Sequence, residues 1–149
     1  MKNWKKLLIA LFVAALFLTL TACSSTPSNP HIKETVVAEQ NGVRITLVGL
    51  SYTNSIFGPE FKFRIENTTD KNLTIQVRNT SVNGYTVSPI MSTEVGAGEK
   101  TYGTLTIFNT DLKDCGIRTI ETLRTKFHIF YTDTFVNYFD TELITMNLK

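Results

Sequence analysis

Cysteine is scarce in this sequence. Only Cys23 and Cys115 occur among 149 residues. If Cys23 is modified, as argued below, no intrachain disulfide can form, which excludes a small disulfide-stabilised scaffold. An apolar share of 42 %, with ten Phe and five Tyr, indicates instead that a hydrophobic core holds the fold together. The length is suited to one such domain.

Long apolar runs and an excess of one charge are also missing. The one extended apolar run, residues 7–20, is shorter than the ~20 residues that a membrane span needs. Lys2, Lys5 and Lys6 precede this run, so the rest of the chain carries twelve Lys and Arg against thirteen Asp and Glu. A net charge of about −1 gives no electrostatic reason to expect nucleic acid as a partner.

Sequence motifs of the common enzyme classes do not occur. The sequence contains no G-x-S-x-G, no H-E-x-x-H, no C-x-x-C and no glycine-rich phosphate loop. We therefore predict a non-enzyme without a cofactor. Cys115 and His128 could serve as a thiol nucleophile and its base. A lone cysteine beside Gly116, at the end of a helical turn, is more often a buried apolar residue, and we favour that core role.

The N-terminus has the pattern of an export signal. Residues 1–6 (MKNWKK) are basic and precede the apolar run, as in a signal peptide. Ordinary cleavage after Ala22 would place bulky Leu20 three residues before the cut. The string Leu20-Thr21-Ala22-Cys23 instead resembles the lipobox of bacterial lipoproteins at every position. The alternative is an uncleaved anchor helix with a free Cys23.

The lipobox resemblance implies a location. Residues 1–22 would be removed, and Cys23 would carry a diacylglycerol that anchors the protein to the extracytoplasmic face of the cell membrane. Two acyl chains, at about 0.8 kcal/mol per buried CH₂, make such an anchor stable. The membrane is therefore the first predicted partner. Residues 23–33, which include SSTPSNP, are predicted to be a flexible tether.

Residues 34–149 show the period-two alternation of β-strands. Asn41-Gly42 separates two β-rich runs and predicts a hairpin. Residues 60–66 alternate between apolar and charged side chains, and residues 73–78 do the same across a polar turn. Asn83-Gly84 marks another turn before 85–94, where Pro89 suggests an edge or a bulge.

The C-terminal half continues the pattern. A strand is expected over 102–108, followed by one helical turn over 111–116 that Asp111 caps and Gly116 ends. Two more strands are expected over 123–131 and 135–148. About eight strands with turns at roughly ten-residue intervals predict an all-β fold, an immunoglobulin-like β-sandwich with one short helical turn.

Several strings in this domain resemble a known group of proteins. They are Gly42 to Tyr52, Gly58-Pro59-Glu60, Ile65-Glu66-Asn67, Val82-Asn83-Gly84-Tyr85 and Asp114-Cys115-Gly116-Ile117. The sequence is in this respect similar to uncharacterised lipoproteins of Gram-positive bacteria that carry an immunoglobulin-like domain of unknown function. The resemblance implies fold and location. It implies no catalytic residue.

The most suggestive surface lies on the outward side of residues 123–131. Arg124, Lys126 and His128 alternate with core positions, and Phe130 would end the strip as an exposed aromatic. A basic strip of this kind can recognise an acidic partner, although a solvated strand face gives the same pattern. We predict a non-catalytic binding module for a protein, peptide or cell-wall partner.

Other interpretations remain open at this point. Imidazole and thioether groups suit copper, loop carboxylates suit calcium, and an exposed edge strand can bind a further strand in a structural or inhibitory role. The metal candidates are His31, His128, Met91 and Met146 for a transition metal, and Asp111, Asp114, Asp133 and Asp140 for calcium. Ile56-Phe57 and Tyr138-Phe139 are apolar where loops are expected, and could either fold back over the sandwich ends or form a ligand-contacting rim.

Overall fold

The computed structural model describes residues 29–53 and 56–148. The predicted signal peptide (1–22), Cys23 and the first part of the predicted tether lie outside these residues. Their roles therefore stay predictions. Within the described ranges, no helix is long and apolar enough to cross a membrane.

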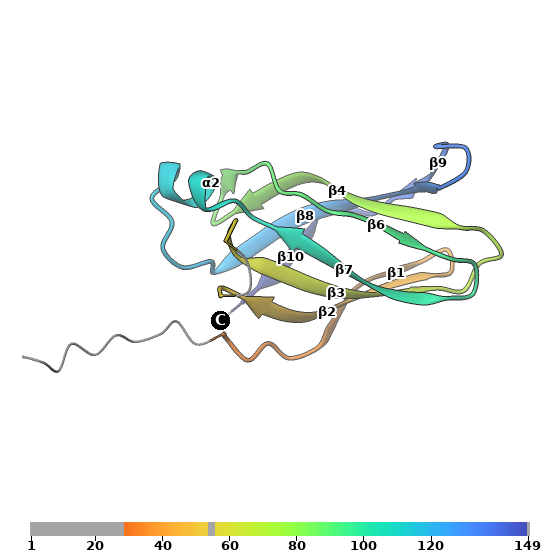
Figure 1. Cartoon of the computed structure of the whole chain (residues 1–149), viewed down its shortest axis with the longest axis horizontal. Helices are drawn as coiled ribbons and strands as arrows, with labels where there is room; N and C mark the ends of the chain where they lie inside the picture. The colour runs from red at the N-terminus through yellow and green to blue at the C-terminus, as the bar shows by residue number, and fades with distance from the viewer. Residues whose placement is uncertain (1–28, 54–55, 149) are drawn as a thin grey trace, which may run out of the picture.

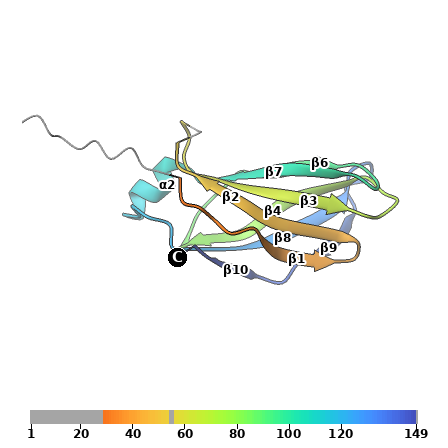
Figure 2. The same ribbon diagram turned by 90° about the horizontal axis from the view of Figure 1, so that it is seen from below.

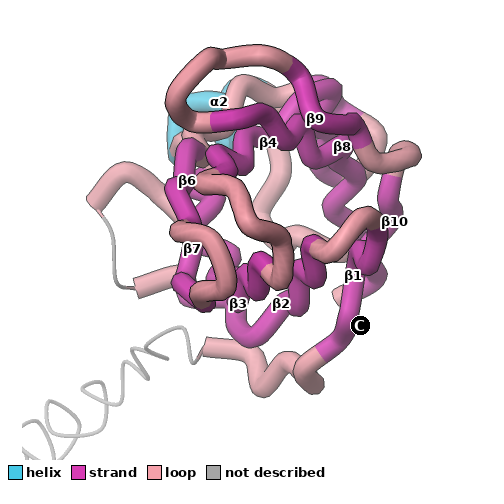
Figure 3. The backbone as a smooth tube through the Cα atoms, turned by 90° about the vertical axis from the view of Figure 1, so that its right-hand side faces the viewer, coloured by secondary structure: helices cyan, strands magenta, loops and turns pink. Residues whose placement is uncertain are grey.

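Two antiparallel sheets pack face to face (Figures 1 and 3). Sheet A has the order β1 (Thr35–Gln40), β2 (Val43–Ser51), β3 (Glu60–Asn67) and β7 (Lys100–Thr106). Sheet B has the order β10 (Ile144–Asn147), β8 (Thr122–Tyr131), β4 (Leu73–Val82) and β5 (Tyr85–Thr86). In addition, β6 (Ser92–Val95) pairs with β4, and β9 (Asn137–Asp140) pairs with β8.

The strand order is that of an immunoglobulin-like sandwich. The chain leaves β3 for sheet B and returns as β7, which pairs with β3 rather than with a sequence neighbour. Strands β2, β3 and β7 take the places of strands A, B and E, while β4, β8 and β10 take those of C, F and G. Strand β1 extends sheet A beyond β2. The predicted fold class is confirmed.

The core lies between the sheets, as the alternation predicted. On β3 the side chains of Phe61, Phe63 and Ile65 are fully buried, and Lys62 between them is exposed. Phe63 meets Phe127 of β8 edge to face, with ring centroids 5.4 Å apart. This contact between strands from both sheets joins the two layers at the middle of the core.

The Asn-Gly turns also form where they were predicted. Asn41 and Gly42 have φ angles of 50° and 78°, and Asn83 and Gly84 have 49° and 87°. A two-residue hairpin turn of type I′ needs positive φ at both positions, which Asn and Gly tolerate best. The sequence therefore determines these hairpins locally.

Two predicted strands are divided in the structure, so the described residues form ten strands rather than about eight. Residues 85–94 split into β5 and β6, because between them Ile90 leaves sheet B and forms an isolated bridge with Thr106. Residues 135–148 split into β9 and β10. Between these strands, the Thr141 hydroxyl accepts a hydrogen bond from the Phe127 backbone N–H at 2.9 Å.

The short helix α2 (Asn109–Asp114) differs from prediction at its start. It begins two residues early, and its N-cap residue, Phe108, makes no side-chain cap. The Asp111 carboxylate instead accepts a hydrogen bond from the Ser88 N–H at 3.0 Å. Asp111 therefore stabilises the turn after β5. Gly116, with φ 67°, follows the helix end as predicted.

The sandwich has two distinct ends (Figures 1 and 2). The helix end carries α2, the β2–β3 connection and the β4–β5 turn, and the chain also reaches Leu148 there. The opposite end carries the Asn41-Gly42 turn and the loops that lead to β4, β7 and β9. The described chain begins at the helix end, where the Asn29 side-chain oxygen accepts a hydrogen bond from the Tyr52 N–H at 2.9 Å.

Candidate binding face

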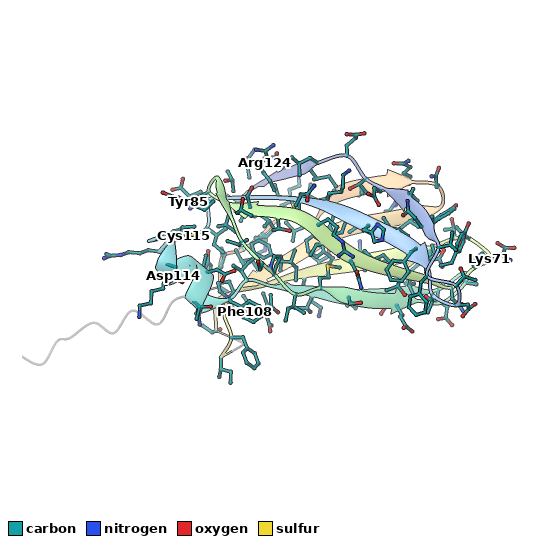
Figure 4. All side chains as sticks on the ribbon, turned by 90° about the horizontal axis from the view of Figure 1, so that it is seen from above. Lys71, Tyr85, Phe108, Asp114, Cys115 and Arg124 are labelled. Carbon is teal, nitrogen blue, oxygen red and sulfur yellow. The ribbon has the colours of Figure 1, made fainter. Side chains whose placement is uncertain are left out.

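The structure adds a cation to the basic strip that the sequence predicted. On the outer side of β8, Arg124 is exposed, while Lys126 and His128 are half-buried. In the β4–β8 register, Lys126 lies opposite Arg78. We call Arg78, Arg124, Lys126 and His128 the basic face. Figure 4 shows the molecule with β4 and β8 in front. The labelled Arg124 side chain points outward from the sheet.

One carboxylate lies against two members of the basic face. The Asp140 oxygens lie 2.6 Å from Nδ1 of His128 and 3.9 Å from Nζ of Lys126. The Arg78 guanidinium donates hydrogen bonds to the Val77 carbonyl and the Gln76 side chain. Among the described residues, no carboxylate oxygen lies within 4.0 Å of the Arg78 or Arg124 guanidinium.

One further acidic side chain belongs to the outer side of sheet B. Glu94 of β6 lies opposite Thr74 of β4. Thr74 comes two residues before Gln76, which pairs with His128. Glu94 therefore lies further along the strands toward the opposite end. Arg78 lies across the ladder from Lys126, and Arg124 lies two residues further along β8 toward the helix end. Among the described residues, the strands that pair with β8 at Arg124 place no acidic side chain opposite it.

Sheet A presents a different outer surface, on which acidic and basic side chains neutralise one another. Lys62 lies over the Tyr102 ring, 4.5 Å from its centroid. The ion pairs on this surface are Arg44–Glu39 at 2.7 Å, Arg64–Glu34 at 3.1 Å, Arg64–Glu66 at 3.5 Å and Lys100–Glu66 at 2.7 Å. The outer side of sheet A therefore has little charge left for a partner.

These ion pairs shift the pKa values of the groups that form them. A hydrogen bond from Lys100 holds the pKa of Glu66 below its ordinary value. Hydrogen bonds and charge attraction raise the pKa of Arg44 through Glu39, and that of Arg64 through Glu34. All three charged forms are stabilised by internal partners.

Phe130 is not the exposed aromatic that the alternation predicted. Its exposed fraction is 7 %, because Phe135 stacks on it with ring centroids 6.0 Å apart and His128 covers it at 5.4 Å. The prediction of an exposed Phe130 is wrong, and only Arg124, Lys126 and His128 of the predicted strip reach the surface.

The exposed aromatic at this position is Phe135, with an exposed fraction of 78 %. Its φ angle of 57° is rare for a bulky residue and places it at the tip of the β8–β9 connection. The sequence pattern predicts residue 135 as the start of a strand, which is wrong. The polar run Thr132-Asp133-Thr134 before it is a turn signal, and could have placed Phe135 at a loop tip.

The structure does not bring Cys115 and His128 together as a thiol nucleophile and its base. Cys115 is half-buried at the end of α2, so the predicted core role is wrong; Leu112 and Ile120 are the buried side chains of this segment. His128 pairs instead with Asp140 of β9, which lies toward the opposite end of the sandwich from α2 (Figure 1).

The metal candidates are likewise dispersed. Met91 and Met146 are buried in the core, whereas His31 is exposed. Asp111 and Asp114 belong to α2, while Asp133 and Asp140 belong to the β8–β9 region. The described part of the chain holds no group of three or more His, Cys, Asp or Glu side chains that could bind one metal ion.

The edge-strand alternative has a structural counterpart. Strands β1 and β10 form neighbouring edges of the two sheets, visible side by side in Figure 3. A groove between them is lined by side chains that include Val36, Leu47 and Met146. Pro89, which suggests an edge or a bulge in the sequence, lies between β5 and β6 and does not line this groove.

Comparison with protein-family models and with curated proteins found no match to this chain. The resemblance to Gram-positive lipoproteins therefore stays a prediction.

Proposed function

We propose that the mature chain is a lipid-anchored protein on the extracytoplasmic face of the cell membrane, and that it is a non-catalytic binding module for an acidic partner. The lipobox at residues 20–23 supports the location. The binding role is supported by one observation: among the described residues, Arg78 and Arg124 lie on the outer side of sheet B with no carboxylate in ion-pair range, whereas the arginines of sheet A are neutralised.

The arrangement suits a partner with repeated anionic groups. Arg124 and Lys126 are two residues apart on one strand, a spacing of roughly 6.6 Å. Arg78 is the neighbour of Lys126 across the ladder, at roughly 5 Å. Arginine binds carboxylates and phosphates through two parallel hydrogen bonds, and a β-sheet holds such side chains at fixed spacing. An acidic stretch of a protein, peptide or wall polymer fits this chemistry.

A charge-matched pair of variants tests the proposal. The purified lipoprotein, held in neutral detergent micelles, is titrated with poly-L-glutamate at several salt concentrations. We expect binding that weakens as salt rises, because exposed charges are screened. Arg78→Gln/Arg124→Gln should weaken it roughly 2- to 30-fold, from ~0.2–1 kcal/mol for each exposed pair.

The control is Arg44→Gln/Arg64→Gln, which removes the same net charge from sheet A. It should change the affinity less than the basic-face variant does. If both variants lose affinity equally, the attraction depends on net charge and not on a site. If the wild-type protein binds no poly-L-glutamate even at low salt, the basic face does not recognise acidic polymers and the proposal fails.

A further inference from the structure

Two consecutive apolar side chains project from the helix end. Ile56 and Phe57 have exposed fractions of 89 % and 62 %. Single exposed apolar residues are common, whereas adjacent ones form a contiguous apolar patch, the kind of surface that contacts a partner protein or a membrane. We propose that Ile56 and Phe57 insert into the lipid interface of the membrane to which the protein is anchored. This inference rests on the lipid anchor of the proposed function.

The backbone beneath this pair is fixed to the body of the domain. Asn109 donates hydrogen bonds to the carbonyls of Phe57, at 2.8 Å, and Ile56, at 3.4 Å. Gly58 passes so close to the Ile107 carbonyl that a Cβ atom at this position would overlap it. The next link is a hydrogen bond from the Ile107 N–H to the Pro59 carbonyl at 3.0 Å. Ile56 and Phe57 are therefore presented outward by a held backbone.

The length of chain before the described residues places this tip near the bilayer. Asn29 contacts the start of the same connection, because its side-chain oxygen accepts hydrogen bonds from Tyr52 and Thr53. Six residue steps separate Asn29 from Cys23, which spans at most about 22 Å of fully extended chain. A lipid on Cys23 thus keeps the base of the Ile56-Phe57 connection close to the membrane surface.

The lipid anchor also allows a weak apolar contact with the membrane to form. Insertion of two side chains is too weak to hold a free protein at a bilayer, but an anchored protein meets that bilayer at a high effective concentration. Phe135 and Val136, which are also exposed, lie at the opposite end of the sandwich from the point where the chain leads to Cys23. Insertion would therefore orient the sandwich, with the helix end toward the lipid.

Tryptophan fluorescence tests this orientation cleanly. The only tryptophan in the sequence is Trp4, in the predicted signal peptide, so the mature chain carries none. Phe57→Trp then supplies a single reporter. The lipidated variant is reconstituted into phosphatidylcholine vesicles, with and without bromine on the acyl chains. We expect a blue-shifted emission and a loss of intensity in the brominated vesicles, relative to the same variant made without lipid by Cys23→Ser.

The matched control is Phe135→Trp, an exposed aromatic at the opposite end that should show neither the shift nor the loss. Ile56→Trp provides a second reporter at the tip if the first variant folds poorly. Co-flotation with vesicles separates the two proposals. If the protein does not float, it lacks the anchor. If it floats but the reporters at positions 56 and 57 are not quenched, the insertion is refuted. A blue shift that increases with protein density and occurs without quenching would show that a second copy of the protein contacts these residues. That result also refutes insertion.

Discussion

Removing the Asn67 side chain should destabilise this fold far more than removing an exposed asparagine. It ends β3, and its exposed fraction is 1 %. Its side-chain nitrogen donates to the carbonyls of Lys71, at 2.8 Å, and Gly96, at 2.9 Å. Its side-chain oxygen accepts from the Thr69 N–H at 3.0 Å and from the Thr69 hydroxyl at 2.8 Å. One amide thus ties the β3–β4 turn to the β6–β7 loop, joining the two sheets at the opposite end.

Asn67→Ala should therefore destabilise the protein by about 2–6 kcal/mol, because the four side-chain hydrogen bonds of 3.0 Å or less are lost at ~0.5–1.5 kcal/mol each. Urea unfolding curves measure this loss, provided that the slope of the transition is unchanged. Asn67→Asp keeps the acceptor but sets a carboxylate against the Lys71 and Gly96 carbonyls. It should also destabilise the fold.

The control lies in the same turn. The Asn72 side chain accepts one hydrogen bond, from the Ala97 N–H at 3.1 Å, and is exposed. Asn72→Ala should cost about 1 kcal/mol or less. Equal unfolding midpoints for Asn67→Ala and Asn72→Ala would refute the role assigned to Asn67.

Two further predictions concern the core and the ion pairs of sheet A. Phe63→Ala should cost ~3–5 kcal/mol, because it opens a cavity against Phe127, whereas Lys62→Ala should cost under ~1 kcal/mol; similar urea midpoints would contradict the register of β3. Because the pKa of folded Glu66 is lowered, the Lys100 pair stabilises the protein above pH ~4.5, and this contribution is lost as the pH falls through the folded value. Lys100→Met should thus be less stable than wild type at neutral pH and converge with it in acid; a pH-independent difference would exclude this linkage.

The features that the sequence predicted correctly are those that depend on neighbours along the chain. The alternation at Phe61, Phe63 and Ile65 follows from the geometry of one strand, and the Asn41-Gly42 turn from the backbone of two residues. Both are local requirements, so no knowledge of the other sheet was needed to see them.

The features that the sequence missed depend on contacts between distant segments. Phe130 was expected to be exposed because β8 alternates, but the β8–β9 register shifts beside it and Phe135 covers its ring. Asp111 was expected to cap a helix, yet it bonds to Ser88, 23 residues earlier. Arg78 belongs to the basic face because the β4–β8 register sets it opposite Lys126, and a pairing between strands so far apart in sequence is not visible in the sequence.

Detection of a lipid on Cys23 is the most direct test of the proposed membrane location. Mass spectrometry of the mature protein extracted from membranes should show a chain that begins at Cys23 and carries the added mass of a diacylglyceryl group. In detergent phase partitioning, that protein should enter the detergent phase, and the Cys23→Ser variant should not. An unmodified N-terminus at another residue, or a Cys23→Ser variant that partitions as the wild type does, would contradict the anchor.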